Sequence, residues 1–214
     1  MADQNKGMSD LWRRLRFVFM AIVVYRLGTH IPIPGIDPAR LAALFDQNQG
    51  TILEMFNLFS GGALERMSIF ALNVVPYISA AIIMQLFSNS IPYLQELKKD
   101  GQAGRNQITQ YTRYGTVVLA FVQASALAVT LGASGLAYEP GTSFFISAVF
   151  SVVAGTIFLM WLGEQISERG IGNGISIIIA TSILTGIPGA IGQALEQARQ
   201  GDLNILLLLG IAVS

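Results

Sequence analysis

The chain has 214 residues, of which 52% are hydrophobic and 12% are charged, and its mean hydropathy is +0.55. Soluble domains carry about 25% charged residues, so this composition is typical of a membrane protein. The net charge is zero and the chain has no cysteine, which excludes a disulfide framework, a thiolate metal site and a cysteine nucleophile. The single histidine cannot form a histidine-based metal cage by itself.

Apolar segments recur along the chain and predict an all-α, polytopic membrane protein. The first predicted span, 15–33, follows a polar tail at 1–14 and precedes an outer loop at 34–58. A single crossing needs about 20 apolar residues, which this segment supplies. In the outer loop, Asp37 and Pro38 predict the N-cap and the first turn of a short helix.

An interrupted helix is predicted next. Residues 59–72 begin near a glycine pair, continue as a mostly apolar stretch too short to cross a bilayer, and stop before Pro76. The pattern predicts a half-helix, hinged at Gly61 and Gly62, that enters the membrane and turns back. Non-helical backbone at membrane depth is tolerated only where protein buries it or where it lines a cavity. The broken helix therefore predicts a cavity or a pore.

The remaining segments alternate spans with connections. They are a span at 74–90, a cytoplasmic hairpin at 91–113, spans at 114–131 and 144–162, a glycine-rich turn at 163–174, a span at 175–191 and the start of a sixth span at 203–214. Asn173 is predicted to cap the fifth span. Because the last run holds about half the residues of a crossing, we expect the chain to be a fragment of a longer membrane protein.

Positive charge predicts the orientation of these spans. With the N-terminus in the cytoplasm, nine of the thirteen Lys and Arg residues lie inside, three lie outside and Arg26 lies within the first span. The nine inner residues are Lys6, Arg13, Arg14, Arg16, Lys98, Lys99, Arg105, Arg113 and Arg169; the three outer ones are Arg40, Arg66 and Arg199. Since Lys and Arg concentrate in cytoplasmic loops, this orientation is favoured, provided that the half-helix does not cross by itself.

Three polar residues stand out within or near the spans. Arg26 either extends its head to the interface or has a buried partner, and its mid-span position favours the buried partner. His30, one turn later, is expected at the outer interface without a chemical role. Gln123 is a lone amide in the third span, and the sequence alone favours a bond to a neighbouring helix over a substrate-facing position.

Two pairs of branched apolar residues have helical spacing, one directly after the broken helix and one at the start of the fifth span. Val74 with Ile78, and Ile175 with Ile179, have i, i+4 spacing, so each pair lies on one helix face. From spacing alone, ordinary packing is the better interpretation. Only their position relative to the broken helix raises the alternative, a hydrophobic constriction in a pore.

Enzyme motifs are missing from the sequence. The chain has no HExxH, GxSxG or Walker A motif, and its predicted spans hold no pair of acidic residues that could act as acid and base. The sequence therefore predicts no enzyme and no cofactor. A proton pump is also disfavoured, since it would be expected to keep an acid within a span.

Several stretches resemble the SecY family, the channel subunits of bacterial protein translocation. They are residues 30–36, 55–72, 75–79, 110–115 and 158–179, in the order in which the family has them. The family is a ten-span channel of two inverted five-span halves. The resemblance covers nearly the whole chain from about residue 11, and implies that the chain supplies the first half and the start of the sixth span.

The resemblance also implies site residues. The plug, a segment that seals the pore from the outer side, would include Phe59, Ser60, Gly61, Gly62, Leu64, Arg66, Met67 and Ser68. The apolar pore ring would include Val74, Ile78, Ile175 and Ile179, and Gln123 would occupy a polar position of the lateral gate. Two departures from the family are Asn73, where glycine is usual, and Val74, where isoleucine is usual.

The partners and location follow from the same resemblance. It implies the small membrane subunits SecE and SecG, the SecA motor ATPase or a ribosome with its nascent chain, signal sequences, bilayer lipid and the second half of the channel. It implies the bacterial inner membrane, a cytoplasmic N-terminus and no covalent chemistry. The alternative from the residues alone is a small-solute transporter built on broken helices, whose binding site would be polar and near the midplane.

Overall fold

The structure, a computed structural model, describes residues 2–47, 60–139 and 141–199. Its helices are α1 (Ala2–Gly28), α2 (Pro38–Gln47), α4 (Val75–Ser90), α5 (Pro92–Lys99), α6 (Gly101–Ala133), α7 (Thr142–Arg169) and α8 (Gly174–Arg199). The described residues otherwise form turns, extended connections and two isolated β-bridges, so the predicted all-α class is confirmed. Phe59 and the predicted sixth span at 203–214 lie outside the described residues.

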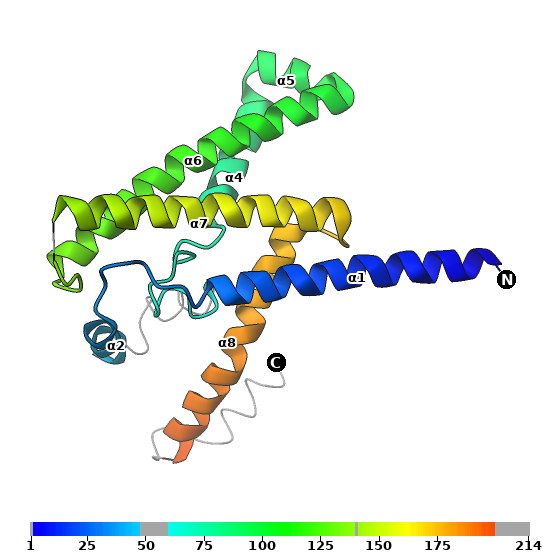
Figure 1. Ribbon diagram of the computed structural model, residues 1–214. Coiled ribbons are helices and arrows are strands. Elements are labelled where there is room, and N and C mark those ends of the chain that lie inside the picture. Colours follow the sequence, from blue (N-terminus) through cyan, green and yellow to red (C-terminus); the bar gives the residue numbers. More distant parts are fainter. Residues whose placement is uncertain (1, 48–59, 140, 200–214) are drawn as a thin grey trace.

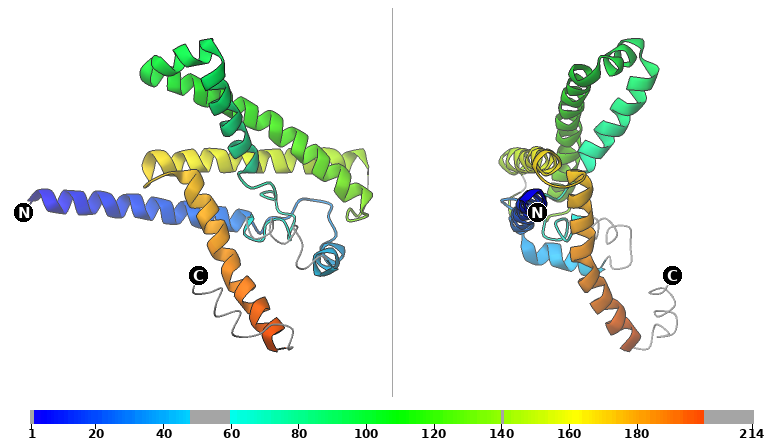
Figure 2. Two further views of the ribbon diagram at one scale, coloured as in Figure 1. Left: turned by 180° about the vertical axis from the view of Figure 1, so that it is seen from behind. Right: turned by 90° about the vertical axis from the view of Figure 1, so that its right-hand side faces the viewer.

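The long helices pack in a crossed arrangement (Figure 1). Helices α1 and α7 run side by side, α6 crosses α7, and α8 starts near the end of α7 and crosses α1. Helices α4 and α6 also run side by side, and with α5 they form an arm that projects from the other helices, which Figure 2 shows from two further directions. The turns of residues 61–74, which precede α4, lie below α7 in Figure 1, next to the end of α1.

The apolar surface of the helices suits a bilayer. In the described part of the chain, α6 and α7 are the two helices long and apolar enough to cross a membrane, and α8 adds a shorter apolar stretch at Gly174–Gly186. Only 28% of the apolar window of α6 is buried, which a core helix of a soluble protein would not tolerate. Exposed side chains such as Phe19, Phe87 and Val118 extend this apolar surface to α1, α4 and α6.

Local signals place most helix ends. The Asp37 carboxylate accepts a hydrogen bond from the Ala39 N–H at 2.9 Å, so the predicted cap of α2 is confirmed. The Asn173 side chain accepts a hydrogen bond from the Ser176 N–H at 3.2 Å, so the predicted cap of α8 is also confirmed. Ile91, which precedes Pro92, is extended and separates α4 from α5, as the steric effect of a proline requires.

Several helices extend beyond the predicted spans, and α1 stops before the predicted end of its span. Helix α1 already includes the predicted tail from Ala2, but it ends at Gly28, before the predicted end at residue 33, because Pro32 and Pro34 cannot continue a helix. Helix α7 continues to Arg169, through the first part of the predicted turn at 163–174. The predicted hairpin at 91–113 is largely helical, and its second arm is continuous with the third span in α6.

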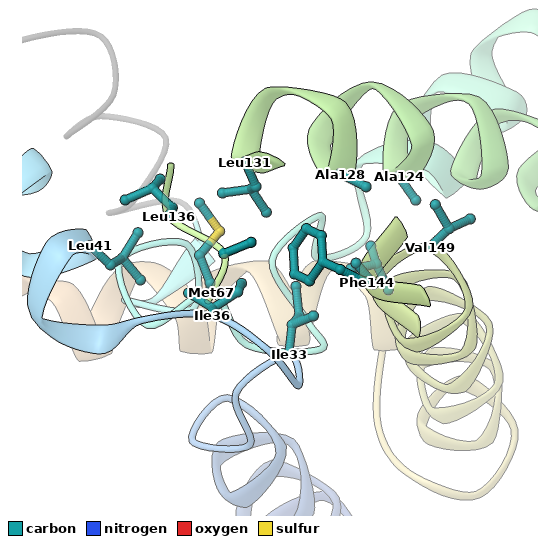
Figure 3. Close-up of a cluster of buried hydrophobic side chains, with 13 residues drawn as sticks. Ile33, Ile36, Leu41, Met67, Ala124, Ala128, Leu131, Leu136, Phe144 and Val149 are labelled. Carbon is teal, nitrogen blue, oxygen red and sulfur yellow. The ribbon is translucent and has the colours of Figure 1, made fainter. Parts of the chain in front are cut away.

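The buried apolar side chains form two clusters. The first cluster consists of Ile33, Ile36, Leu41, Met67, Ala124, Ala128, Leu131, Leu136, Ala137, Phe144, Ala148, Val149 and Val152. Figure 3 shows its centre, where the Phe144 ring of α7 lies between Ile33 and the small residues of α6. The second cluster consists of Ala21, Tyr25, Ala63, Phe70, Val74, Leu159, Leu162, Ile166 and Ile178. It joins α1, α7, α8 and the turns before α4 into one packed unit.

Candidate functional site: a turn-built segment against an apolar cluster

The segment predicted to be a half-helix is a series of turns over residues 61–74. We call residues 60–73 the plug segment. Its backbone N–H groups at Ala71, Asn73 and Val75 donate to the carbonyl oxygens three residues earlier, at 2.8 to 3.2 Å. Met67 and Asn73 have positive φ angles of 41° and 48°, which an α-helix does not allow. The prediction of a helix over 63–72 is therefore wrong.

Besides the bonds of its own turns, the plug segment forms backbone hydrogen bonds with another part of the chain. Ile33 N–H donates to the Met67 carbonyl at 2.8 Å, and Ile69 N–H donates to the Ile31 carbonyl at 3.0 Å. These bonds flank an antiparallel bridge between Pro32 and Ser68. Pairing with the proline-rich stretch after α1 satisfies groups that a helix would have satisfied internally, and this explains why turns replace the helix.

The structure brings the four predicted ring residues to one cluster. Val74 is a buried member of the second cluster, and Ile78, Ile175 and Ile179 are partly buried and pack against it. Val74 directly precedes α4 and Ile78 lies in its first turn, whereas Ile175 and Ile179 lie in the first two turns of α8. Residues about one hundred positions apart in sequence thus meet on one apolar surface beside the plug segment.

Aromatic stacking fixes the plug segment in place. The Phe70 ring stacks between Tyr25 of α1, at a centroid distance of 6.0 Å, and Phe158 of α7, at 5.9 Å. Both neighbouring rings are parallel to Phe70 within 4°. Offset stacking of this kind adds about 0.5–1.5 kcal/mol per pair beyond the area buried.

Two helix glycines make room for this arrangement. A Cβ atom on Gly155 of α7 would lie 2.1 Å from the Ile69 carbonyl oxygen, and one on Gly28 of α1 would lie 2.0 Å from the Phe70 ring. The plug segment therefore lies directly on helix backbone, and any larger residue at these positions would displace it. Small residues at the interfaces of membrane helices serve the same purpose.

Arginine and histidine side chains form hydrogen bonds at the edge of the plug segment. Arg26 Nη1 donates to the Gly61 carbonyl at 3.0 Å, so the predicted partner of this in-span arginine is confirmed and is a backbone oxygen of the plug segment. Arg66 lies 3.2 Å from His30 Nε2, and His30 Nδ1 lies 2.8 Å from the Arg26 carbonyl. Since a guanidinium only donates, His30 accepts at Nε2 and donates from Nδ1, and is the neutral tautomer in this arrangement.

The described plug residues divide between the two clusters. Met67 is a buried member of the first cluster and Leu64 packs against it, whereas Ala63 and Phe70 belong to the second. Ser60, Gly61 and Ser68 are buried, Gly62 is half-buried and Arg66 is exposed. The segment thus lies between both apolar clusters and contributes side chains to each.

Gln123 does not join this site. It is half-buried on α6, and its neighbour Ala124 belongs to the first cluster. Its role at a lateral gate stays a prediction.

An ion pair ties the first half of α6 to the last turns of α7. Arg113 donates two hydrogen bonds to the Glu164 carboxylate, at 2.7 and 2.9 Å. These bonds raise the pKa of the Arg113 guanidinium above its ordinary value. Bidentate geometry fixes the relative rotation of the two helices as well as their distance.

Sequence reasoning missed the polar residues that support the plug segment from behind. The Tyr25 hydroxyl and the Ser182 hydroxyl lie 2.6 Å apart, and both side chains are buried. Asn73 Nδ2 donates to the same Ser182 hydroxyl at 3.3 Å. A tyrosine and a serine inside apolar spans were the available signal, but their partners lie too far away in sequence to be found from spacing.

The fold defined by these helices is that of protein-conducting channels. A solved structure of "Sec61 in the Canine ribosome-channel complex from the endoplasmic reticulum" matches 91% of this chain and 43% of that chain, with a TM-score of 0.62 and 21% identity. "The structure of a protein conducting channel" matches with the same values. At this identity the likeness shows the fold alone.

Sequence comparison adds the family. The SecY family model matches residues 68–214, and the chain belongs to the SecY family. It is 62% identical over 212 residues to the protein translocase subunit SecY of Pseudomonas aeruginosa, covering 99% of this chain and 48% of that relative. It is 59% identical to the same subunit of Escherichia coli K12, covering 97% and 48%. The chain thus spans about half the length of these relatives.

Proposed function

We propose that this chain forms one side of the channel that moves unfolded secretory proteins across, and inserts membrane proteins into, the bacterial inner membrane. The observation that carries the proposal is the meeting of Val74, Ile78, Ile175 and Ile179 on one apolar surface beside the plug segment. Branched apolar side chains can surround an extended peptide, and they exclude bulk water when the channel is idle. The plug segment adds a second seal.

The partners of the channel belong to the same proposal. The chain would pair with the second half of the channel, with SecE and SecG, and with SecA or a ribosome and its nascent chain. The matched Sec61 structure is described as part of a ribosome–channel complex, which supports the ribosome as a partner. Signal sequences and hydrophobic nascent spans would leave the channel sideways, past Gln123, and enter the lipid. Insertion into the lipid is favourable by about 0.3–0.6 kcal/mol for each Leu, Ile, Phe or Val.

The protein performs no covalent chemistry in this proposal, and the energy comes from its partners. The relatives named as translocase subunits favour a channel over the alternative of a small-solute transporter. The apolar character of the surface formed by α4 and α8 supports the same choice, because a transporter site near the midplane would be polar.

Polar substitutions on the ring test the proposal. Ile78→Asn and Ile179→Asn, in the protein assembled in its membrane, are expected to raise ion leakage and to let defective signal sequences pass, because an amide in the ring admits water. Ile82→Asn is the matched control, since Ile82 lies one turn further along α4 and is exposed. A change in the affinity for a small solute, with no leak and unchanged protein export, would reject the channel in favour of the transporter.

The proposed orientation has a test of its own. A single cysteine at position 66, in a chain that has no other, should react with a membrane-impermeant thiol reagent from the outer side, because Arg66 is exposed on the plug segment. Reaction only from the cytoplasmic side would contradict both the cytoplasmic N-terminus and the re-entrant path of the segment.

A further inference from the structure

One buried side chain of α8 is hydrogen-bonded both to α1 and to the end of the plug segment. The Ser182 hydroxyl lies 2.6 Å from the Tyr25 hydroxyl of α1 and accepts from Asn73 Nδ2, at the end of the segment, at 3.3 Å. Ser182, Tyr25 and Asn73 are 0%, 1% and 5% exposed, so these bonds form away from water. Polar contacts in such surroundings are stronger, and costlier to break, than those at a surface.

The two hydroxyls of this group have more acceptors within reach than hydrogens to donate. Ser182 Oγ can donate to the Ile178 carbonyl, at 2.9 Å, or to the Tyr25 hydroxyl, and in both cases it accepts from Asn73 Nδ2. The Tyr25 hydroxyl donates to Ser182 in the first arrangement and to the Ser60 carbonyl, 3.4 Å away at the start of the plug segment, in the second. Both arrangements link Tyr25, Ser182 and Asn73.

The start of the plug segment lies on the same turn of α8. A Cβ atom added to Gly61 would lie 3.1 Å from Ser182 Cα and 3.2 Å from the Ser182 carbonyl oxygen. Gly61 also has a φ of +65°, which side chains rarely adopt, so glycine is required there on two grounds. Both ends of the plug segment thus lie against one residue of the fifth span.

Asn73 combines a left-handed backbone with a side-chain bond to α8. Its φ of 48° is in the left-handed region, where asparagine is one of the few residues tolerated besides glycine. A glycine would allow the same backbone but could not reach Ser182. The asparagine therefore keeps the turn and adds a bond to α8.

We propose that Tyr25, Ser182 and Asn73 form a latch that holds both ends of the plug segment against α8 in the closed channel. The three are positioning residues, and the proposal rests on the proposed function only in treating the segment as a plug. Breaking the latch raises the fraction of time that the segment spends away from α8. The ring residues and their packing remain in place.

Cysteine labelling of Ala63 measures this directly. Ala63 is 1% exposed in the second cluster, so a cysteine there reacts with an impermeant maleimide only when the plug segment moves. In the membrane-embedded protein with Ala63→Cys, Ser182→Ala is expected to raise the labelling rate about tenfold, since it removes a hydroxyl that is hydrogen-bonded to two buried side chains. Tyr25→Phe keeps the stacked ring, loses one bond, and is expected to give about a fivefold increase.

Matched controls separate the latch from general loosening. Thr181→Ala removes the neighbouring hydroxyl of α8, which donates to Ile177 in its own helix, and should leave the rate at Ala63→Cys unchanged. A reference cysteine at Ala137, 2% exposed in the first cluster, should label at the same slow rate in every variant. The labelling rate of the double variant Y25F/S182A should be at most about twice that of S182A, because both substitutions break the same contact.

Two results would overturn the latch. One is an equal labelling rate at Ala63→Cys for S182A and T181A; the other is a parallel increase at the Ala137 reference site, which indicates loss of packing. The failure of the proposed function is a separate outcome, because a parent protein that exports no polypeptide would still give these labelling rates. Labelling therefore decides the latch, and export decides the channel.

Discussion

The two apolar clusters differ in the side chains that lie at their edges. The first cluster joins α6, α7 and the loops near them, and its members are almost all fully buried apolar groups that pack around Phe144 (Figure 3). The second cluster has partly buried branched residues on one side and the buried hydroxyls of Tyr25 and Ser182 on the other. The first cluster is an apolar core. The second has buried hydrogen-bonding side chains beside the plug segment, and we expect this boundary to be the one that opens.

The comparison predicts its largest effect at the centre of the first cluster. Phe144→Ala should lower the free energy of unfolding by about 3–5 kcal/mol, the usual cost of a large cavity in a core. Phe150→Ala in the same helix is the control, since Phe150 is 66% exposed. Thermal unfolding in detergent measures both. Equal losses for the two variants would remove the distinction between a buried core and the lipid-facing side of α7.

A second prediction concerns the glycine beneath the plug segment. Gly155→Ala should destabilise the protein by about 1–3 kcal/mol, because its Cβ meets the Ile69 carbonyl and a backbone must move. Gly132→Ala, in a helix with open space at the Cβ position, should be neutral or stabilising by up to about 1 kcal/mol. If both substitutions stabilise by similar amounts, the plug segment does not rest on α7 as described.

A third prediction sharpens the difference in function. Ile78→Ala should cost only about 1–2 kcal/mol of unfolding free energy, because Ile78 is already partly exposed at the edge of the second cluster. It should nevertheless raise ion conductance across the membrane, whereas Val149→Ala in the first cluster should lower stability without a leak. Conductance of planar bilayers that hold the purified complex tests the pair, and the reverse assignment would exchange the roles of the clusters.

The smallest expected effect lies at the ion pair of Arg113 and Glu164, neither of which belongs to either cluster. Glu164→Gln leaves Arg113 with a neutral partner and should cost about 0.5 kcal/mol or less, because the Arg113 side chain is 43% exposed and solvent screens the pair. The loss should shrink further as salt is added. Glu168→Gln is the comparison, because Glu168 is near the same arginine but does not share its hydrogen bonds. A large loss of unfolding free energy for Glu164→Gln that does not depend on salt would indicate that the pair is buried.

Hydropathy and local signals could predict the helices but not the plug segment. Apolar runs marked α4, α6, α7 and α8, and the side chains of Asp37 and Asn173 marked two helix starts, because these features depend on neighbours in sequence. The turns of residues 61–74 depend on pairing with residues 31–33, and this pairing overrides the local preference for a helix. The buried bonds of Ser182 depend on partners in α1 and before α4, which no spacing rule connects.

The resemblance to the family added what periodicity could not. Spacing alone favoured ordinary packing for Val74, Ile78, Ile175 and Ile179, and only the family pattern grouped the two pairs. The structure then placed all four against one cluster. Their joint role as a ring stays a prediction, as does the role of Gln123, because the other side of the channel is needed to form either.

The division of the plug segment between two cores has a mechanical consequence. Met67 is seated in one core while Ala63 and Phe70 are seated in the other, so a partial displacement would lose burial on one side and gain none elsewhere. Such an element should switch cooperatively between two positions, with few intermediates. Distances measured between spin labels on the segment and on α7 should then fall into two separate populations; a single broad distribution would indicate gradual motion.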